Sequence, residues 1–220
     1  MRYHFIGTHF IDAPGRTFLK NLSKLRFSPI EKRDLIKSWF AISLAFSIAL
    51  AGVSFNGTFA LLMAVSAITV GLGFLLHELA HKAVAVHFGL WAEYRSFDTM
   101  LLLSLIGSLF GFLFAAPGAV FITGKNKEYC LIPADKNGKI SAAGPLMNFM
   151  LAVCFLGIAF AFPAMTKLAL WGAQINAWLG LFNMIPILNF DGSKIWPWSK
   201  PVFASMVAIG AGLMIAIGAL

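Results

Sequence analysis

Residues Gly71–Gly89 read GLGFLLHELAHKAVAVHFG, and His77, Glu78 and His81 lie inside this stretch. Two histidines four positions apart project from one face of a helix, about one turn from each other. Two imidazoles need this spacing to hold one zinc ion, and Glu78 is then placed to take a proton from water at the metal. The stretch therefore predicts a metal-binding helix.

The residues just before this motif are apolar. Phe59–Leu76 is a run of eighteen residues without a charged side chain, which is typical of a membrane-spanning helix. Histidine and glutamate are costly inside such a run and usually mark a functional site. Because Lys82 directly follows the second histidine, we expect the metal site near one membrane face rather than at mid-bilayer.

The composition indicates an integral membrane protein. The chain has 220 residues, of which 59% are hydrophobic and 12% charged, and its mean hydropathy is +0.81. Ordinary globular domains carry about 25% charged residues. The net charge of +8 does not require a nucleic-acid partner, because much of the basic excess lies beside predicted spans. We expect no nucleic acid, and we expect the lipid bilayer itself as a partner.

We predict an all-α polytopic membrane protein with about five to six hydrophobic segments. Residues 1–37 form a basic N-terminal segment, and residues 38–220 form the membrane domain. Besides the motif helix, the predicted spans are Ser38–Phe55, Ile140–Phe162, Lys167–Leu188 and Val202–Leu220.

The region between the motif helix and the next span is mixed. Met100–Ala116 is apolar but short, and Pro117-Gly118 closes it. Ala119–Thr123 is β-prone, and Lys125–Lys139 is polar with Gly138 as a turn residue. We therefore expect a small β-hairpin or re-entrant region here.

The position of Asp191 constrains the topology. Apart from Glu78, Asp191 is the only acidic residue just past the end of a well-defined span. If it is the third metal ligand, it lies at the depth of the histidines, the two helices run in the same direction, and an odd number of spans separates them. Since Ile140–Phe162 is one span, Met100–Ala116 must be re-entrant, lie in the interface or cross twice.

The basic residues support the same topology. If Met100–Ala116 does not cross, sixteen of the seventeen Lys and Arg residues fall on one side, leaving only Lys167 on the other. A single crossing would split them eleven to six. The positive-inside rule favours the first arrangement and makes the basic side cytoplasmic. We expect a multi-pass cell-membrane protein whose N-terminus and active-site opening are cytoplasmic.

Three motifs carry a family resemblance, and in chain order they are His77-Glu78-Leu79-Ala80-His81, Gly144-Pro145-Leu146-Met147-Asn148, and Asn183-Met184-Ile185-Pro186 followed by Asp191-Gly192. With these motifs the chain resembles the site-2 proteases, a family of intramembrane zinc metalloproteases, over about residues 59–195. It looks closest to compact prokaryotic members without a PDZ domain. Two positions depart from the family pattern: Phe190 replaces the usual Leu or Met, and Asn189 stands where proline is common.

The resemblance implies a three-helix catalytic core and a transmembrane protein as substrate. It implies one zinc ion per chain, held by His77, His81 and Asp191, with Glu78 as the catalytic base. Asn148 or Asn183 would bind the substrate backbone or the oxyanion, although each could instead form a helix–helix hydrogen bond. A substrate helix must unwind before it is cut, and Ala119–Thr123 could bind the unwound segment by strand addition or pair only with its neighbours.

Two alternatives remain open from the sequence. His87 lies ten residues after His77, where metzincins place a third histidine, but Val84 occupies the position at which that motif needs a glycine turn. The second alternative is a non-proteolytic zinc-binding membrane protein or transporter, because intramembrane histidine and acidic residues also mark ion paths.

Overall fold

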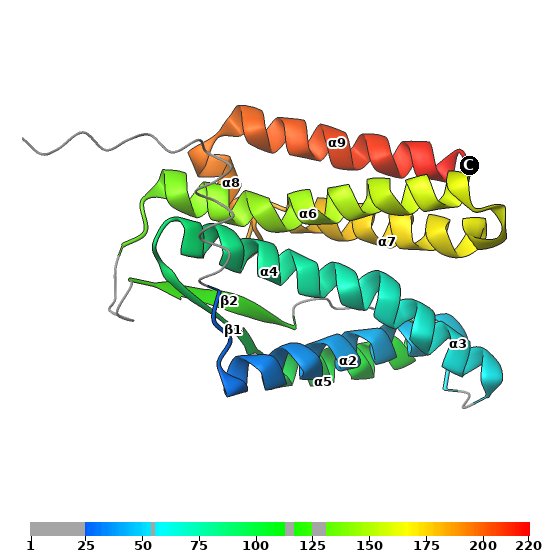
Figure 1. Cartoon of the computed structure of the whole chain (residues 1–220). Helices are drawn as coiled ribbons and strands as arrows, with labels where there is room; N and C mark the ends of the chain where they lie inside the picture. Colours follow the sequence, from blue (N-terminus) through cyan, green and yellow to red (C-terminus); the bar gives the residue numbers. More distant parts are fainter. Residues whose placement is uncertain (1–24, 54–55, 113–116, 125–130) are drawn as a thin grey trace, which may run out of the picture.

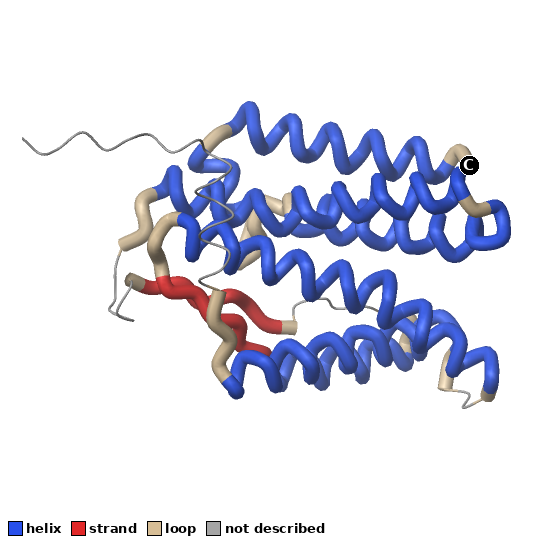
Figure 2. Tube along the Cα trace, viewed as in Figure 1, coloured by secondary structure: helices blue, strands red, loops and turns tan. Residues whose placement is uncertain are grey.

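The computed structural model describes residues 25–53, 56–112, 117–124 and 131–220, and these are mainly helical (Figures 1 and 2). Much of the predicted basic N-terminal segment, residues 1–24, lies outside the described residues. In chain order the elements are α2 (Pro29–Ala51), α3 (Gly57–Ser66), η1 (Ala67–Gly71), α4 (Leu72–His87), β1 (Trp91–Ser96), α5 (Asp98–Leu109), β2 (Gly118–Thr123), α6 (Ala134–Ala161), η2 (Pro163–Met165), α7 (Thr166–Asn183), α8 (Gly192–Trp198) and α9 (Lys200–Gly218).

Helix α2 begins at Pro29, well before the predicted start at Ser38. Ser28 caps the helix, since its side chain accepts a hydrogen bond from the main-chain N–H of Glu31 at 3.1 Å. Serine at the cap, proline at the first helical position and glutamate two residues later form a strong helix start. Hydropathy alone located the apolar part of the helix and missed its polar first turns.

Residues Gly57–His87 form one long helix that contains the metal-binding motif. Its middle, η1, is a short π-helical turn between α3 and α4. Side chains from two other helices bond to carbonyl groups of this turn: Trp39 Nε1 donates to the carbonyl of Ala67, and Asn176 Nδ2 donates to that of Thr69. Such turns leave carbonyl groups without their usual helical partners, and they occur often near functional sites.

Strands β1 and β2 form a two-stranded antiparallel sheet, and α5 lies between them in the sequence. Ser96, the last residue of β1, is paired with Gly118, the first residue of β2, so the chain returns to the place from which it left the sheet. Helix α5 has 12 residues and packs along α2. At a rise of 1.5 Å per residue it is about 18 Å long, too short to cross the roughly 30 Å hydrocarbon core. Helix α5 therefore does not form a membrane span by itself, and Ser96 and Gly118, which precede and follow it in the sequence, lie side by side in the sheet.

Helix α4 lies between two groups of elements. Helices α6, α7 and α9 lie together on one side of α4, and α2, α5 and the sheet lie on the other (Figures 1 and 2). Helix α6 begins at Ala134, so Gly138 is inside a helix, and its prediction as a turn residue is wrong. Trp198 of α8 packs directly where a Cβ atom of residue 138 would be. Close helix packing, rather than a turn, explains this glycine.

The fold class is confirmed: the protein is an all-α polytopic membrane protein with one small sheet. Four helices among the described residues are long and apolar enough to span a membrane, namely Pro29–Ala51, Gly57–His87, Ala134–Ala161 and Lys200–Gly218. The predicted span Lys167–Leu188 is observed as the helix α7, which ends at Asn183, packs along α6 and is not one of these four. Met184–Asp191 then leads to α8 and carries the acidic residue that the sequence singled out.

Candidate metal centre

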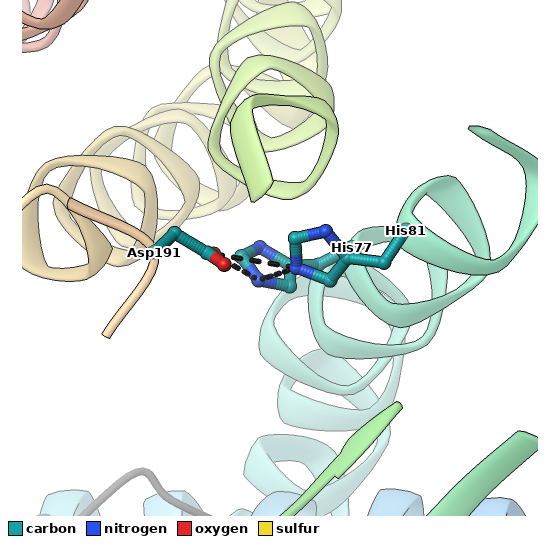
Figure 3. Close-up of side chains that lie close together, drawn as sticks. All are labelled: His77, His81 and Asp191. Atoms are coloured by element: carbon teal, nitrogen blue, oxygen red, sulfur yellow. Dashed lines mark hydrogen bonds and ion pairs between the residues drawn. The ribbon is translucent and has the colours of Figure 1, made fainter. Parts of the chain in front are cut away.

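Three side chains point toward one another beside helix α4 (Figure 3). His77 and His81 belong to α4, and Asp191 is the residue just before α8. Oδ2 of Asp191 lies 3.3 Å from Nε2 of each histidine, and the two Nε2 atoms lie 3.0 Å apart. All three residues are buried. The structure thus brings together the three residues that the family resemblance grouped from distant parts of the chain.

This triangle of atoms fits a metal ion. In tetrahedral zinc sites the bonds to nitrogen and oxygen are about 2.0–2.1 Å, which places neighbouring ligand atoms about 3.3 Å apart. The three observed distances of 3.0, 3.3 and 3.3 Å are close to that spacing. Among the residues that the structure describes, His77, His81 and Asp191 form the cluster whose ligand atoms could hold a metal ion.

The second ring nitrogen of each histidine bonds to α6. Nδ1 of His77 lies 2.6 Å from Oδ1 of Asn148, and Nδ1 of His81 lies 2.8 Å from the carbonyl oxygen of Ile140. Because both partners are acceptors, each Nδ1 carries the proton, and each Nε2 is left with its lone pair toward the cluster. The two imidazoles therefore have the tautomer that a metal ligand needs.

Asn148 is itself held by a second asparagine. Its Nδ2 donates to the carbonyl of Gly73 and to Oδ1 of Asn176, both at 3.2 Å. Asn176 in turn donates to the carbonyls of Thr69 and Gly172. Both asparagines have 0% exposure. The sequence analysis did not single out Asn176, although a buried polar residue in an apolar segment was the available signal.

Helix α6 approaches the cluster closely at Gly144. A Cβ atom at this position would lie 2.5 Å from Nε2 of both His77 and His81. Any side chain here would displace the imidazoles or move the helix. Only a glycine at this position lets α6 lie this close to the two histidines.

Asp191 is ionised in this setting. Burial alone would raise its pKa, but when the two histidines are also protonated at Nε2, the positive charge of His81 and the hydrogen bonds from both rings outweigh burial and lower the pKa of Asp191 below its ordinary value. The main-chain carbonyl of Asp191 also accepts bonds from the N–H groups of Lys194 and Ile195, so α8 holds the residue in place. A carboxylate is the form that binds a divalent cation.

A pocket opens beside the cluster. Polar and charged side chains, together with strand β2, form its wall; the lining residues are His77, Glu78, His81, Gly118, Ala119, Val120, Ile122, Asn137, Ile140, Ser141, Asn183, Asn189, Asp191 and Lys194. Glu78 is therefore in the same pocket as the three cluster residues. Asn183 also lines it, while its Nδ2 donates to the carbonyl of Leu179.

The two asparagines suggested by the resemblance thus differ in position. Asn183 lies at the pocket wall, whereas Asn148 is directed at His77 and at the helix junction. Lys194 and Asn189 also line the pocket, and the sequence analysis gave them no role. They lie on either side of Asp191, and this proximity to a candidate ligand was the only sequence signal for them.

The metzincin alternative receives no support from the position of His87. This residue ends α4, and its ring packs against Phe88 with the ring centres 5.6 Å apart. His87 does not belong to the cluster formed by His77, His81 and Asp191.

Comparison with known proteins gives one informative relative. A protein of Methanocaldococcus jannaschii with the name "Putative zinc metalloprotease" is 39% identical over 187 residues, which cover 83% of this chain and 92% of the relative. No family model matches the chain. No solved structure matches it significantly.

Proposed function

Since the chain belongs to the family of this archaeal relative, we propose that it is a zinc metalloprotease that hydrolyses peptide bonds within or near transmembrane segments of membrane proteins. The observation that carries the proposal is the buried triangle of His77, His81 and Asp191, whose two histidines lie in the C-terminal half of an apolar helix long enough to span a membrane. Such a site serves regulated intramembrane proteolysis, in which a membrane-anchored substrate is cut.

We propose His77, His81 and Asp191 as the ligands of one zinc ion per chain. Three protein ligands leave a fourth tetrahedral position open, which distinguishes catalytic from structural zinc sites. A zinc ion in such a site would polarise the scissile carbonyl group and would lower the pKa of a water at the metal to about 7. Asn148 and the carbonyl of Ile140 orient the two imidazoles for this task.

Glu78 is the proposed general base. It follows His77 in the sequence and lines the pocket beside the three ligands. Its carboxylate accepts the proton of the attacking water and later donates it to the leaving amine. Asn183 at the pocket wall is the better placed of the two asparagines to bond to the substrate backbone.

Strand β2 is the proposed docking edge for the unwound substrate. A helical substrate keeps its amides bonded internally and must unwind before its peptide bond is accessible. Gly118, Val120 and Ile122 of β2 line the pocket with the metal cluster. An extended substrate paired with this strand would place its main chain beside the reacting groups.

The opening of the site is proposed to face the cytoplasm. Ser96 and Gly118, which stand before and after the Met100–Ala116 region in the sequence, are paired in the sheet, which supports the arrangement with sixteen of the seventeen Lys and Arg residues on one side. The positive-inside rule makes that side cytoplasmic in a cell membrane.

The proposal is tested by metal analysis and by cleavage of a transmembrane test substrate, with wild type and Glu78→Gln compared in the same detergent or bilayer. Wild type should contain one zinc ion per chain and cut the substrate. Glu78→Gln should keep zinc and substrate binding and lose cleavage. Zinc-loaded wild type that binds but never cuts a panel of unwinding-prone substrates would support the non-proteolytic alternative.

A further inference from the structure

A buried ion pair lies on the side of α4 that faces α2 and the sheet. Nζ of Lys82 donates to both carboxylate oxygens of Glu31, at 2.6 and 2.5 Å, and to the carbonyl of Arg26 at 2.7 Å. Lys82 is 2% exposed and Glu31 is 0% exposed. Lys82 directly follows His81, so this pair ties the metal-binding helix to the start of α2.

Glu31 also holds the sheet. Its Oε1 accepts a hydrogen bond from the main-chain N–H of Tyr94 in β1, at 3.0 Å. This N–H points away from β2, so Tyr94 and its partner Val120 form a non-hydrogen-bonded pair of the ladder. The bond from the N–H of Phe97 to the carbonyl of Pro117, at 2.8 Å, fixes the same alternation.

This alternation determines which groups β2 presents at its outer edge. In a non-hydrogen-bonded pair the main-chain groups of both residues point away from the partner strand. Those of Val120, and of Gly118 and Ile122 two positions away, therefore point away from β1. These are the β2 residues that the pocket shares with His77 and His81, together with Ala119. Glu31 thus binds the β1 edge of the sheet at Tyr94, and Val120, the partner of Tyr94, has its main-chain groups free to pair at the β2 edge.

We propose that Glu31 and Lys82 are positioning residues that set the distance between the outer edge of β2 and the metal centre. Lys82 supplies the link to the ligand-bearing helix, and Glu31 transmits it through Tyr94 to Val120. The inference rests on the proposed function, in which β2 receives the substrate strand. It assigns a task to a charged pair that stability alone does not require, because well-packed apolar pairs often replace buried ion pairs without loss of stability.

Two double variants separate positioning from charge pairing. E31Q/K82M removes both charges but keeps an amide oxygen for the N–H of Tyr94. E31L/K82M removes the charges and the acceptor. Neither leaves one buried charge without its partner, which would destabilise the protein strongly. The exposed pair Lys37–Asp98, which joins α2 to the start of α5, gives the matched control K37M/D98N.

The first measurement is cleavage kinetics with zinc content determined in parallel. E31L/K82M should raise KM about tenfold with kcat changed less than about threefold, because a displaced strand weakens substrate placement while the metal site stays intact. E31Q/K82M should raise KM less, and K37M/D98N should not change it. Zinc content should stay at one ion per chain in all three.

The second measurement is amide hydrogen exchange in the metal-loaded protein without substrate. In E31L/K82M, exchange should accelerate in residues 91–96 and 118–123 and stay unchanged in residues 72–87. If E31L/K82M does not fold, E31M/K82M takes its place, since methionine fills irregular apolar space.

Equal exchange and equal KM in E31L/K82M and E31Q/K82M would overturn the inference. Loss of zinc with faster exchange in α4 would also overturn it, because the pair would then support the metal-binding helix only. If wild type cuts no substrate, the proposed function fails, while the exchange measurement still decides whether Glu31 and Lys82 position the sheet.

Discussion

Oδ1 of Asn148 lies 2.6 Å from Nδ1 of His77, and neither group is open to solvent. The amide group of Asn148 has a partner for each of its polar atoms: His77, the carbonyl of Gly73 and Asn176. A residue of the second motif thus orients a residue of the first. The prediction that Asn148 binds substrate stays a prediction. The contacts of Asn148 favour a role in holding His77, a proposed metal ligand.

Replacing Asn148 with alanine should therefore weaken zinc binding. The loss of the hydrogen bond to His77 frees the imidazole to rotate and to change tautomer, and outer partners of this kind are worth roughly 10–100-fold in metal affinity. Competition with a chelator of known affinity measures the change. Asn183→Ala is the matched control, since Asn183 bonds to the carbonyl of Leu179 rather than to a ligand. Equal zinc affinity in the two variants would contradict this role for Asn148.

Replacing Asp191 with alanine should abolish stable zinc binding, because the two histidines alone leave a site with one ligand too few. His87→Ala should keep one zinc ion per chain, since His87 ends α4 and its ring packs on Phe88. Metal analysis of the purified proteins distinguishes the two. Zinc loss in His87→Ala with retention in Asp191→Ala would restore the metzincin alternative.

Replacing Gly144 with alanine should damage the site without touching a ligand chemically. The added Cβ atom would lie 2.5 Å from Nε2 of both histidines, so either the rings or α6 must move. We expect loss of cleavage and weaker zinc binding. Gly157→Ala in the same helix is the control, because no atom lies within 4 Å of the Cβ atom it would add. Similar behaviour of the two variants would show that the close approach at Gly144 does not constrain the site.

Replacing Val120 with proline should abolish cleavage while zinc content is kept. Proline removes an N–H group that points to the outer edge of β2, where the substrate strand is proposed to pair, and leaves the bonds to β1 in place. Val120→Ala keeps that N–H and should remain active. Unchanged cleavage by Val120→Pro would remove strand addition from the mechanism.

The sequence located this site through local periodicity. Two histidines four residues apart share a helix face wherever that helix packs, so His77 and His81 could be paired without knowledge of the fold. The apolar runs predicted the spans for the same reason, although the polar first turns of α2 and α6 lay outside the hydropathy signal. The strand at Ala119–Thr123 was also anticipated, because β-prone residues between turn signals need no distant partner to be recognised.

Apart from Asp191, which the family resemblance grouped with the two histidines, only the tertiary structure decided which distant groups meet at the site. The bond of Asn148 to His77, the contact of Asn176 with the π turn, and the pairing of Lys82 with Glu31 each join residues more than 50 positions apart. The sequence predicts Gly138 as a turn residue, because a glycine in a polar stretch looks the same whether it bends the chain or makes room for a tryptophan from another helix. The physical reason is that helix and strand periodicity are properties of a few consecutive residues, whereas the partner of a buried polar side chain depends on how separate helices pack.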